Sequence, residues 1–106
     1  MDEAMKKDFI ARSFTVNGIV QGIGFRPFVY RLALHYGLKG EISNTTTGVS
    51  LHVEGLEGDI ESFSRDLNEK RPPLAYITEI SSKSAPVRNF KEFAITKSIN
   101  RKTFPR

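Results

Sequence analysis

A run of nine residues at positions 20–28 marks the point where an extended segment gives way to a helix. It reads Val-Gln-Gly-Ile-Gly-Phe-Arg-Pro-Phe. Gly22 and Gly24 let the backbone enter left-handed conformations, in which successive amides converge on one point, and the following helix adds the positive end of its dipole. The guanidinium of Arg26 supplies donors that match two phosphate oxygens. The junction therefore predicts a site for a small anion.

The helix after this junction is expected to begin at Pro27, whose missing N–H is harmless in a first turn. Arg26 should then stand just outside the helix, because a residue before proline is disfavoured in the α region. The helix is expected to run to about Tyr36 and to end at Gly37 with a left-handed cap. The residues expected to face a sheet are Phe28, Val29, Leu32, Ala33 and Tyr36.

The opposite side of this helix also carries two apolar residues, Tyr30 and Leu34. A helix that is apolar nearly all round is usually covered on both sides. Scattered apolar residues are nevertheless ordinary on protein surfaces. Both interpretations, coverage by another domain and an ordinary surface, stay open at this point.

Alternating hydrophobicity and turn signals predict five strands and a second helix in the rest of the chain. The strands are expected at residues 13–20, 39–44, 49–54, 75–84 and 90–98. Asp59 should cap the second helix. In that helix the apolar residues that recur at helical spacing are Ile60, Phe63 and Leu67.

The order of these elements, βαββαβ with an extra terminal strand, predicts an α+β fold of the ferredoxin-like, split βαβ type. One antiparallel sheet would carry both helices on one face. The chain has the length of a single domain, which is expected over residues 12–98. Residues 1–11 are expected to form a polar N-terminal arm, and residues 99–106 a basic tail or the start of a linker.

Composition removes several kinds of chemistry. The 106 residues contain no cysteine, so disulfides, thiolate metal ligands and a cysteine nucleophile are excluded. His35 and His52 are expected to be solvated and have no acidic cluster at ligand spacing, so no metal site is expected. The net charge of +4 permits an anionic ligand without arguing for nucleic acid. No stretch approaches a membrane span, and the charged first eight residues indicate a cytoplasmic protein.

An anion loop needs a partner before it becomes an active site, and Asn44, at the end of the second predicted strand, is the best candidate. The residue pattern alone does not place Asn44 beside Arg26. However, residues 20–26, followed by Gly-Glu-Ile-Ser-Asn-Thr at 40–45 and Gly-Val at 48–49, resemble the acylphosphatase family over nearly all of residues 12–98. Residues 26–33 and the Pro-Pro-Leu-Ala segment at 72–75 are most similar to the N-terminal domain of the hydrogenase maturation carbamoyltransferases, the HypF family.

The resemblance implies hydrolysis of the carboxyl-phosphate bond of acyl phosphates, with carbamoyl phosphate the favoured substrate. In that family the phosphate is wrapped by the amides of a loop that matches Gln21, Gly22, Ile23, Gly24, Phe25 and Arg26. Arg26 would bind phosphate oxygens, and Asn44 would orient the attacking water. Because an acyl phosphate already has a good leaving group, positioning and charge stabilisation suffice, and neither a metal nor a cofactor is expected.

Other functions compete with this interpretation. The same element order occurs in RNA-recognition domains, but those need aromatic side chains in a central strand, and residues 49–54 have none. A domain that binds a phosphate compound without turnover, or that serves as an interdomain module, is the remaining alternative. Full carbamoyltransferases continue into zinc-binding and catalytic segments that this sequence lacks. The chain is therefore expected to be an excised domain, with further domains as partners, or a free-standing relative.

Overall fold

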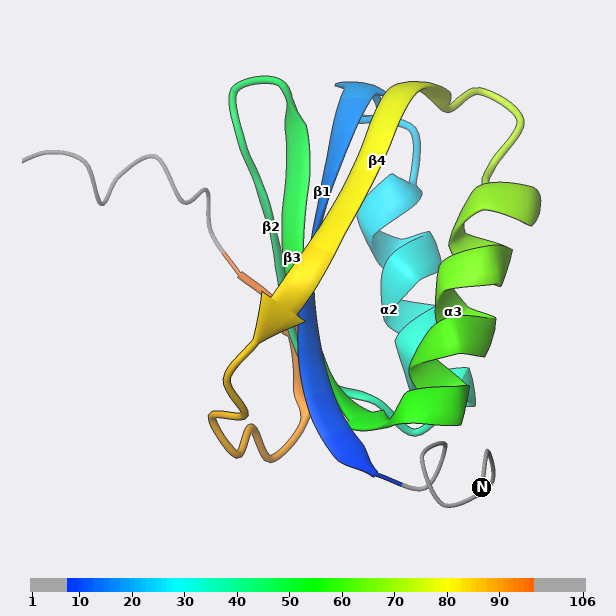
Figure 1. The fold of residues 1–106 in the computed structure, drawn as a ribbon. Coiled ribbons are helices and arrows are strands. Elements are labelled where there is room, and N and C mark those ends of the chain that lie inside the picture. The colour runs from blue at the N-terminus through cyan, green and yellow to red at the C-terminus, as the bar shows by residue number, and fades with distance from the viewer. Residues whose placement is uncertain (1–7, 97–106) are drawn as a thin grey trace, which may run out of the picture.

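The fold is described for residues 8–96 of a computed structural model, in which five strands form one sheet and two helices cover one of its faces (Figure 1). Along the chain the elements are β1 (Phe9–Ile19), α2 (Phe25–His35), β2 (Lys39–Asn44), β3 (Gly48–Leu56), α3 (Glu57–Glu69), β4 (Tyr76–Ala85) and β5 (Phe93–Ile95). The predicted ferredoxin-like α+β fold, with an extra terminal strand, is confirmed.

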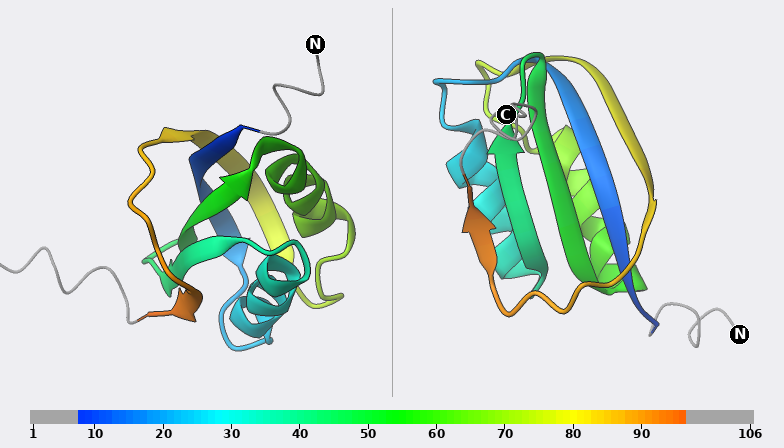
Figure 2. Two further views of the ribbon diagram at one scale, coloured as in Figure 1. Left: turned by 90° about the horizontal axis from the view of Figure 1, so that it is seen from below. Right: turned by 90° about the vertical axis from the view of Figure 1, so that its left-hand side faces the viewer.

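The strands are arranged in the order β4-β1-β3-β2-β5, so β1 and β3 are central neighbours. The β1–β4, β1–β3 and β2–β3 pairs are antiparallel, but β5 runs parallel to β2. The four strands of the βαββαβ unit are thus antiparallel, as predicted, and the extra terminal strand, whose direction was not predicted, makes the sheet mixed. After β4 the chain crosses to the far edge of the sheet (Figure 2). There it returns beside β2, which already runs in the same direction.

The core lies between the sheet and the helices. On the inner face of the central strands Phe14 of β1 pairs with Leu51 of β3, and these two side chains are 1% and 2% exposed. The ring of Phe14 meets that of Phe63 of α3 edge-on, with centroids 5.8 Å apart. Each such buried side chain contributes about 1.5–3 kcal/mol. The expected helical core residues Ile60, Phe63 and Leu67 are all buried.

The first strand begins earlier than predicted. β1 starts at Phe9 because β3 extends to Leu56 and offers pairing partners over that whole length. Residues 9–11, which were expected in a polar arm, therefore belong to the sheet. Residues 1–7 of the expected arm and the whole expected tail at 99–106 lie outside the described residues. β5 is shorter than predicted, and residues 97 and 98 of the predicted strand are also outside that range.

Both helices begin before the residues predicted to start them. α2 begins at Phe25, so Arg26 is inside its first turn. Proline is still tolerated at position 27, because the amide of Phe28 is the first to bond within the helix, to the carbonyl of Gly24 at 3.0 Å. α3 follows β3 directly, with Leu56 as its N-cap. Asp59 is therefore not a cap but an acidic first-turn residue that favours the helix dipole.

The end of α2 is as predicted. Gly37 has a φ of 69°, and its amide bonds the carbonyl of Leu34 at 3.1 Å. The amide of Leu38 bonds the carbonyl of Ala33 at 2.8 Å, which completes a Schellman motif. This motif reverses the chain, so that β2 returns antiparallel to α2.

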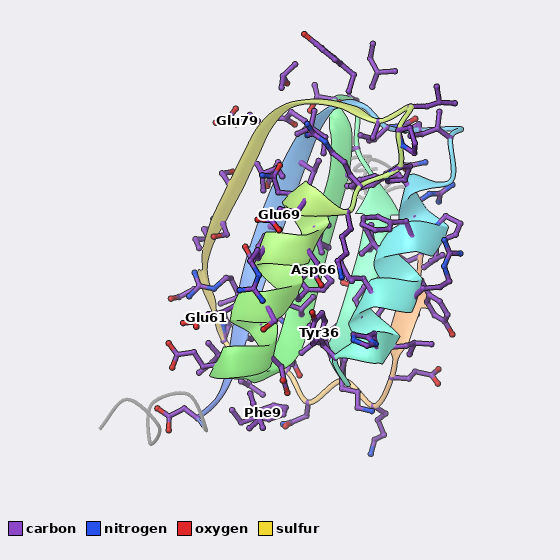
Figure 3. All side chains as sticks on the ribbon, turned by 90° about the vertical axis from the view of Figure 1, so that its right-hand side faces the viewer. Phe9, Tyr36, Glu61, Asp66, Glu69 and Glu79 are labelled. Atoms are coloured by element: carbon purple, nitrogen blue, oxygen red, sulfur yellow. The ribbon has the colours of Figure 1, made fainter. Side chains whose placement is uncertain are left out.

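One side-chain hydrogen bond joins the two helices. The hydroxyl of Tyr36, at the end of α2, donates to the carboxylate of Asp66 in α3 at 2.5 Å, and Figure 3 shows both residues between the helices. The bond raises the pKa of Tyr36 and lowers the pKa of Asp66.

Tyr30, on the outer side of α2, packs against Phe93 of β5 with ring centroids 6.2 Å apart. The extra strand therefore covers this part of the helix, and Leu34 stays exposed.

The open face of the sheet holds a buried charged group. Glu54 of β3 is fully buried and accepts hydrogen bonds from the amides of Arg88 (2.5 Å) and Phe90 (3.1 Å) and from His52 Nε2 (2.7 Å). His52 is itself buried, so the expectation that it is solvated was wrong. The chain between β4 and β5 covers both residues, which an alternating strand pattern does not reveal.

Candidate active site

The predicted site residues lie at one end of the molecule. α2 and β2 pack against each other and run in opposite directions, and their lengths, 11 and 6 residues, correspond to about 16 Å and 20 Å. The first turn of α2, with Arg26, is therefore at the same end as Asn44, the last residue of β2. Figure 1 shows the β1–α2 loop and the β2–β3 turn together at this end.

The loop before α2 has the conformation of an anion cradle. Gly22 and Gly24 have φ angles of 78° and 83°, and Gly24 is the N-cap of α2. A Cβ on either glycine would meet nothing within 4 Å, so glycine is needed here for its backbone angle. The amides of residues 22–26 belong to this loop and to the first turn of α2. These amides stand at the positive end of a helix whose first turn has no acidic residue.

Arg26 is a half-buried side chain in the first turn of α2. It makes no hydrogen bond or ion pair with any other described residue. No described residue therefore occupies its guanidinium, and the anion-binding role given to Arg26 from the sequence stays a prediction. Arg26 lies inside α2 rather than before it. It is therefore in the first turn, where the amides have no hydrogen-bond partner within the helix.

Asn44 faces the helical side of the sheet. Side chains alternate along a strand, and Ile42, two residues earlier, is completely buried under the helices. Asn44 pairs with Val49 of β3, which is also a core residue. Its half-buried side chain therefore projects toward the layer in which α2 begins, and not toward the open face.

The side chain of Gln21 connects the loop to the turn that follows Asn44. Its Nε2 donates to the carbonyls of Thr45 at 2.9 Å and Gly48 at 3.1 Å. Sequence reasoning assigned only the backbone of Gln21 to the site and missed this side-chain role. The only available signal was its amide group at the start of a loop, and such a group has too many possible partners to be assigned without a fold.

A second set of contacts holds the same turn against β1. The amide of Gly18 bonds the carbonyl of Thr47 at 2.9 Å, and the Thr47 hydroxyl bonds the Asn17 side chain at 2.8 Å. The Thr45 hydroxyl accepts a hydrogen bond from the amide of Thr47 at 3.3 Å, which stabilises the turn from within. The loop and the turn therefore form one cross-linked unit.

The surface pockets do not by themselves identify this site. One of about 230 Å³ lies between the loop and the turn and is lined by Gly18, Ile19, Val20, Gln21, Thr46, Thr47 and Gly48. It does not include Arg26 or Asn44. A larger one, of about 580 Å³, lies between α3 and β4. An anion bound by backbone amides at a helix N-terminus needs no deep cavity. The geometry of the loop is therefore better evidence for the location of the site than the volume of a pocket.

Comparison with known proteins identifies the class to which this fold and loop belong. Residues 12–95 match the sequence profile of the acylphosphatase family, so the chain belongs to that family. An acylphosphatase of Thermotoga petrophila is 40% identical over 88 residues, which are 80% of this chain and 94% of that protein. An acylphosphatase structure from Coxiella burnetii has a TM-score of 0.78 at 26% identity, over 87% of this chain and 97% of that one.

Within that family, carbamoyltransferases are also close relatives. A probable carbamoyltransferase HypF of Methanocaldococcus jannaschii is 44% identical over 88 residues, which are 82% of this chain. A full-length HypF in a phosphate- and nucleotide-bound form has a TM-score of 0.83 at 42% identity over 87% of this chain. The chain spans only 12% of each of these two proteins. The resemblance to the acylphosphatase-like domain of HypF is therefore confirmed.

Two features of the described residues bear on other functions. Neither helix is long and apolar enough to cross a membrane. Within residues 8–96 no group of three or more histidine or acidic side chains is placed to hold a metal ion.

Proposed function

We propose that this chain hydrolyses acyl phosphates, with Arg26 and the amides of residues 21–26 binding the phosphate and Asn44 orienting the water. One observation carries the proposal. Gln21 bonds the loop before α2 to the turn that follows Asn44, and Arg26, in the first turn of α2, has no hydrogen-bond or ion-pair partner within residues 8–96. Membership of the acylphosphatase family supports the reaction class.

The chemistry needs only groups that this end of the molecule supplies. The water oxygen forms a bond to phosphorus while the bond from phosphorus to the acyl oxygen breaks. A carboxylate leaves, and the proton of the water passes to phosphate or solvent. Charge accumulates on the equatorial phosphate oxygens, where Arg26 and the loop amides would stabilise it. The amide of Asn44 can donate to and accept from a water molecule, which suits the positioning role.

The finer proposal concerns the substrate and the biological setting. We infer that carbamoyl phosphate is the preferred substrate and that the chain acts as the acylphosphatase-like part of a carbamoyltransferase in [NiFe]-hydrogenase maturation. The support is the identity to HypF proteins, of which this chain corresponds to a small part. The alternative is a module that binds a phosphate ligand, or joins other domains, without turnover.

The test is hydrolysis of acetyl phosphate and carbamoyl phosphate by the natural chain and by variants. Arg26→Ala should lose about 3–4 kcal/mol of transition-state stabilisation, a fall of about 10²–10³-fold in kcat/KM. It should also weaken binding of inorganic phosphate, measured by calorimetry. Asn44→Ala should lower kcat while leaving phosphate affinity largely unchanged. Arg31→Ala, an exposed arginine further along α2, is the matched control and should hydrolyse normally.

The outcomes separate the alternatives. Phosphate binding that depends on Arg26 without any turnover would support the non-catalytic module. Equal turnover in all variants would exclude the site. A higher kcat/KM for acetyl phosphate than for carbamoyl phosphate would contradict the substrate assignment. The setting is tested by replacing the corresponding segment of a HypF carbamoyltransferase with this chain, which should sustain hydrogenase activity only when Arg26 is intact.

A further inference from the structure

β4 is an open edge of the sheet. It is hydrogen-bonded to β1 on one side, and no other described strand pairs with its outer side. In Figure 2 it lies at the opposite edge from β5. Most of its ten residues are exposed. Such an edge presents a row of unsatisfied backbone donors and acceptors, which can add a further strand.

The regular part of this edge is well suited to pairing. An extra residue, Thr78, interrupts the register with β1, and its hydroxyl bonds the carbonyl of Asn17 at 3.1 Å. Beyond it, seven consecutive residues from Glu79 to Ala85 pair with β1 without interruption. They contain no proline or glycine, which would weaken pairing with another strand.

We propose that the outer edge of β4 pairs antiparallel with β4 of a second copy of this chain, about a two-fold axis at Ser81. Glu79 and Lys83 lie two residues on either side of Ser81. In this register Glu79 faces the partner's Lys83, and Lys83 faces the partner's Glu79. Opposite charges directly across a strand pair are favourable. Parallel pairing in register would instead oppose like charges.

The fold leaves room for this arrangement. Glu79, Ser81 and Lys83 pair with Asn17, Thr15 and Ser13 of β1, which lie on the open face of the sheet. The charge pairs therefore form on the face without helices. On the other face α3 packs chiefly over β1 and β3, and it is separated from β4 by the hollow of about 580 Å³. A two-fold axis perpendicular to the sheet keeps the helices of both copies on one side, with these hollows adjoining.

The exposed apolar residues near this strand agree with an antiparallel partner. Leu74 and Tyr76, at the start of β4, are 75% and 64% exposed, and Val87, just after its end, is 37% exposed. Antiparallel pairing brings the start of one β4 next to the end of the other. The apolar residues at both ends would then approach each other and lose contact with water.

Sedimentation of the 106-residue chain over a range of concentrations tests the proposal. The natural chain should show a reversible dimer. Glu79→Lys or Lys83→Glu alone opposes like charges at two places and should weaken dimerisation at least tenfold. The double variant Glu79→Lys/Lys83→Glu re-creates both pairs and should restore it. Glu92→Lys and Lys91→Glu, exposed residues near the opposite edge, are matched charge controls and should dimerise normally.

The register has its own test, because the chain has no cysteine. Ser81→Cys places two thiols on the two-fold axis and should form a disulfide-linked dimer on mild oxidation. Ser84→Cys should not, because its two copies would be about 20 Å apart, far beyond disulfide reach. A monomer at all concentrations, failure of the double variant to restore the dimer, or equal cross-linking by both cysteine variants would overturn the proposal.

Discussion

Gln21 is the residue on which the two halves of the candidate site depend. Its side-chain amide makes two hydrogen bonds to the turn after Asn44, at 2.9 and 3.1 Å. Arg26 and Asn44 belong to different elements, 18 positions apart in the sequence. Gln21 therefore acts as a positioning residue in the proposed reaction, because it can hold the phosphate loop at a set distance from the water-orienting residue.

Replacing Gln21 tests this positioning role. Gln21→Met keeps the length of the side chain and removes the donors, and Gln21→Glu does the same while adding a charge. We expect each variant to lose about 1–2 kcal/mol of stability and to lower kcat about tenfold, with a smaller effect on phosphate affinity. Urea unfolding and steady-state kinetics measure these quantities. If only Gln21→Glu were impaired, repulsion of phosphate by the new carboxylate, and not the lost hydrogen bonds, would be the cause.

At the scale of elements, the β1–α2 loop and the β2–β3 turn need glycine for different reasons. Gly24 has a positive φ, and a Cβ there would meet nothing within 4 Å. Gly48, the first residue of β3, has no such strain, but its Cβ would lie 1.9 Å from the carbonyl oxygen of Val16 in β1. The first is a conformational requirement, and the second is a requirement of space between two paired strands.

Two alanine substitutions should reveal this difference. Gly24→Ala should cost about 1–2 kcal/mol, the strain of a left-handed alanine, and leave the sheet intact. Gly48→Ala must push β1 and β3 apart and should cost more than about 3 kcal/mol. Urea unfolding of both variants measures the difference. Equal destabilisation would contradict the distinction.

At the scale of the whole molecule, Glu54 holds the segment between β4 and β5 in place. This segment crosses from one edge of the sheet to the other. The amides of Arg88 and Phe90 and the ring of His52 all bond the carboxylate of Glu54. Burial alone would raise the pKa of Glu54, but these hydrogen bonds outweigh it and hold the pKa below its ordinary value. The ion pair of Arg88 with Glu41, at 3.5 Å, adds a weaker contact at the same place.

The depressed pKa sets the direction of a pH dependence. A carboxyl group that titrates lower in the folded than in the unfolded state stabilises the fold above the unfolded pKa, about 4.3 for glutamate. That contribution is lost as the pH falls through the folded value. Glu54→Gln should therefore lower the free energy of unfolding by about 2 kcal/mol at pH 7.

The difference between natural chain and variant should narrow below about pH 4. Urea unfolding at several pH values checks this, with Glu92→Gln as the exposed control. The same difference at pH 3 as at pH 7 would show that the charge of Glu54 is not responsible.

Much of this protein follows from local sequence. Strand alternation, the Gly37 helix end and the helical spacing of Ile60, Phe63 and Leu67 are short-range signals, and all agree with the structure. The backbone conformation of the loop before α2 is local too, because it rests on the left-handed glycines Gly22 and Gly24. The sequence by itself therefore determined the element order, most of the core and the glycine-containing loop for which anion binding is predicted.

The tertiary structure decided what depends on contacts between distant segments. The bonds from Gln21 to the β2–β3 turn, the burial of His52 and Glu54, and the parallel alignment of β5 beside β2 each join residues far apart in the chain. The hydrophobic periodicity of a strand indicates which face of the sheet a side chain occupies. It does not indicate whether another segment of the chain covers that face. Only the fold brings Asn44 to the end of the molecule at which Arg26 lies, because that juxtaposition arises from the reversal of the chain between α2 and β2.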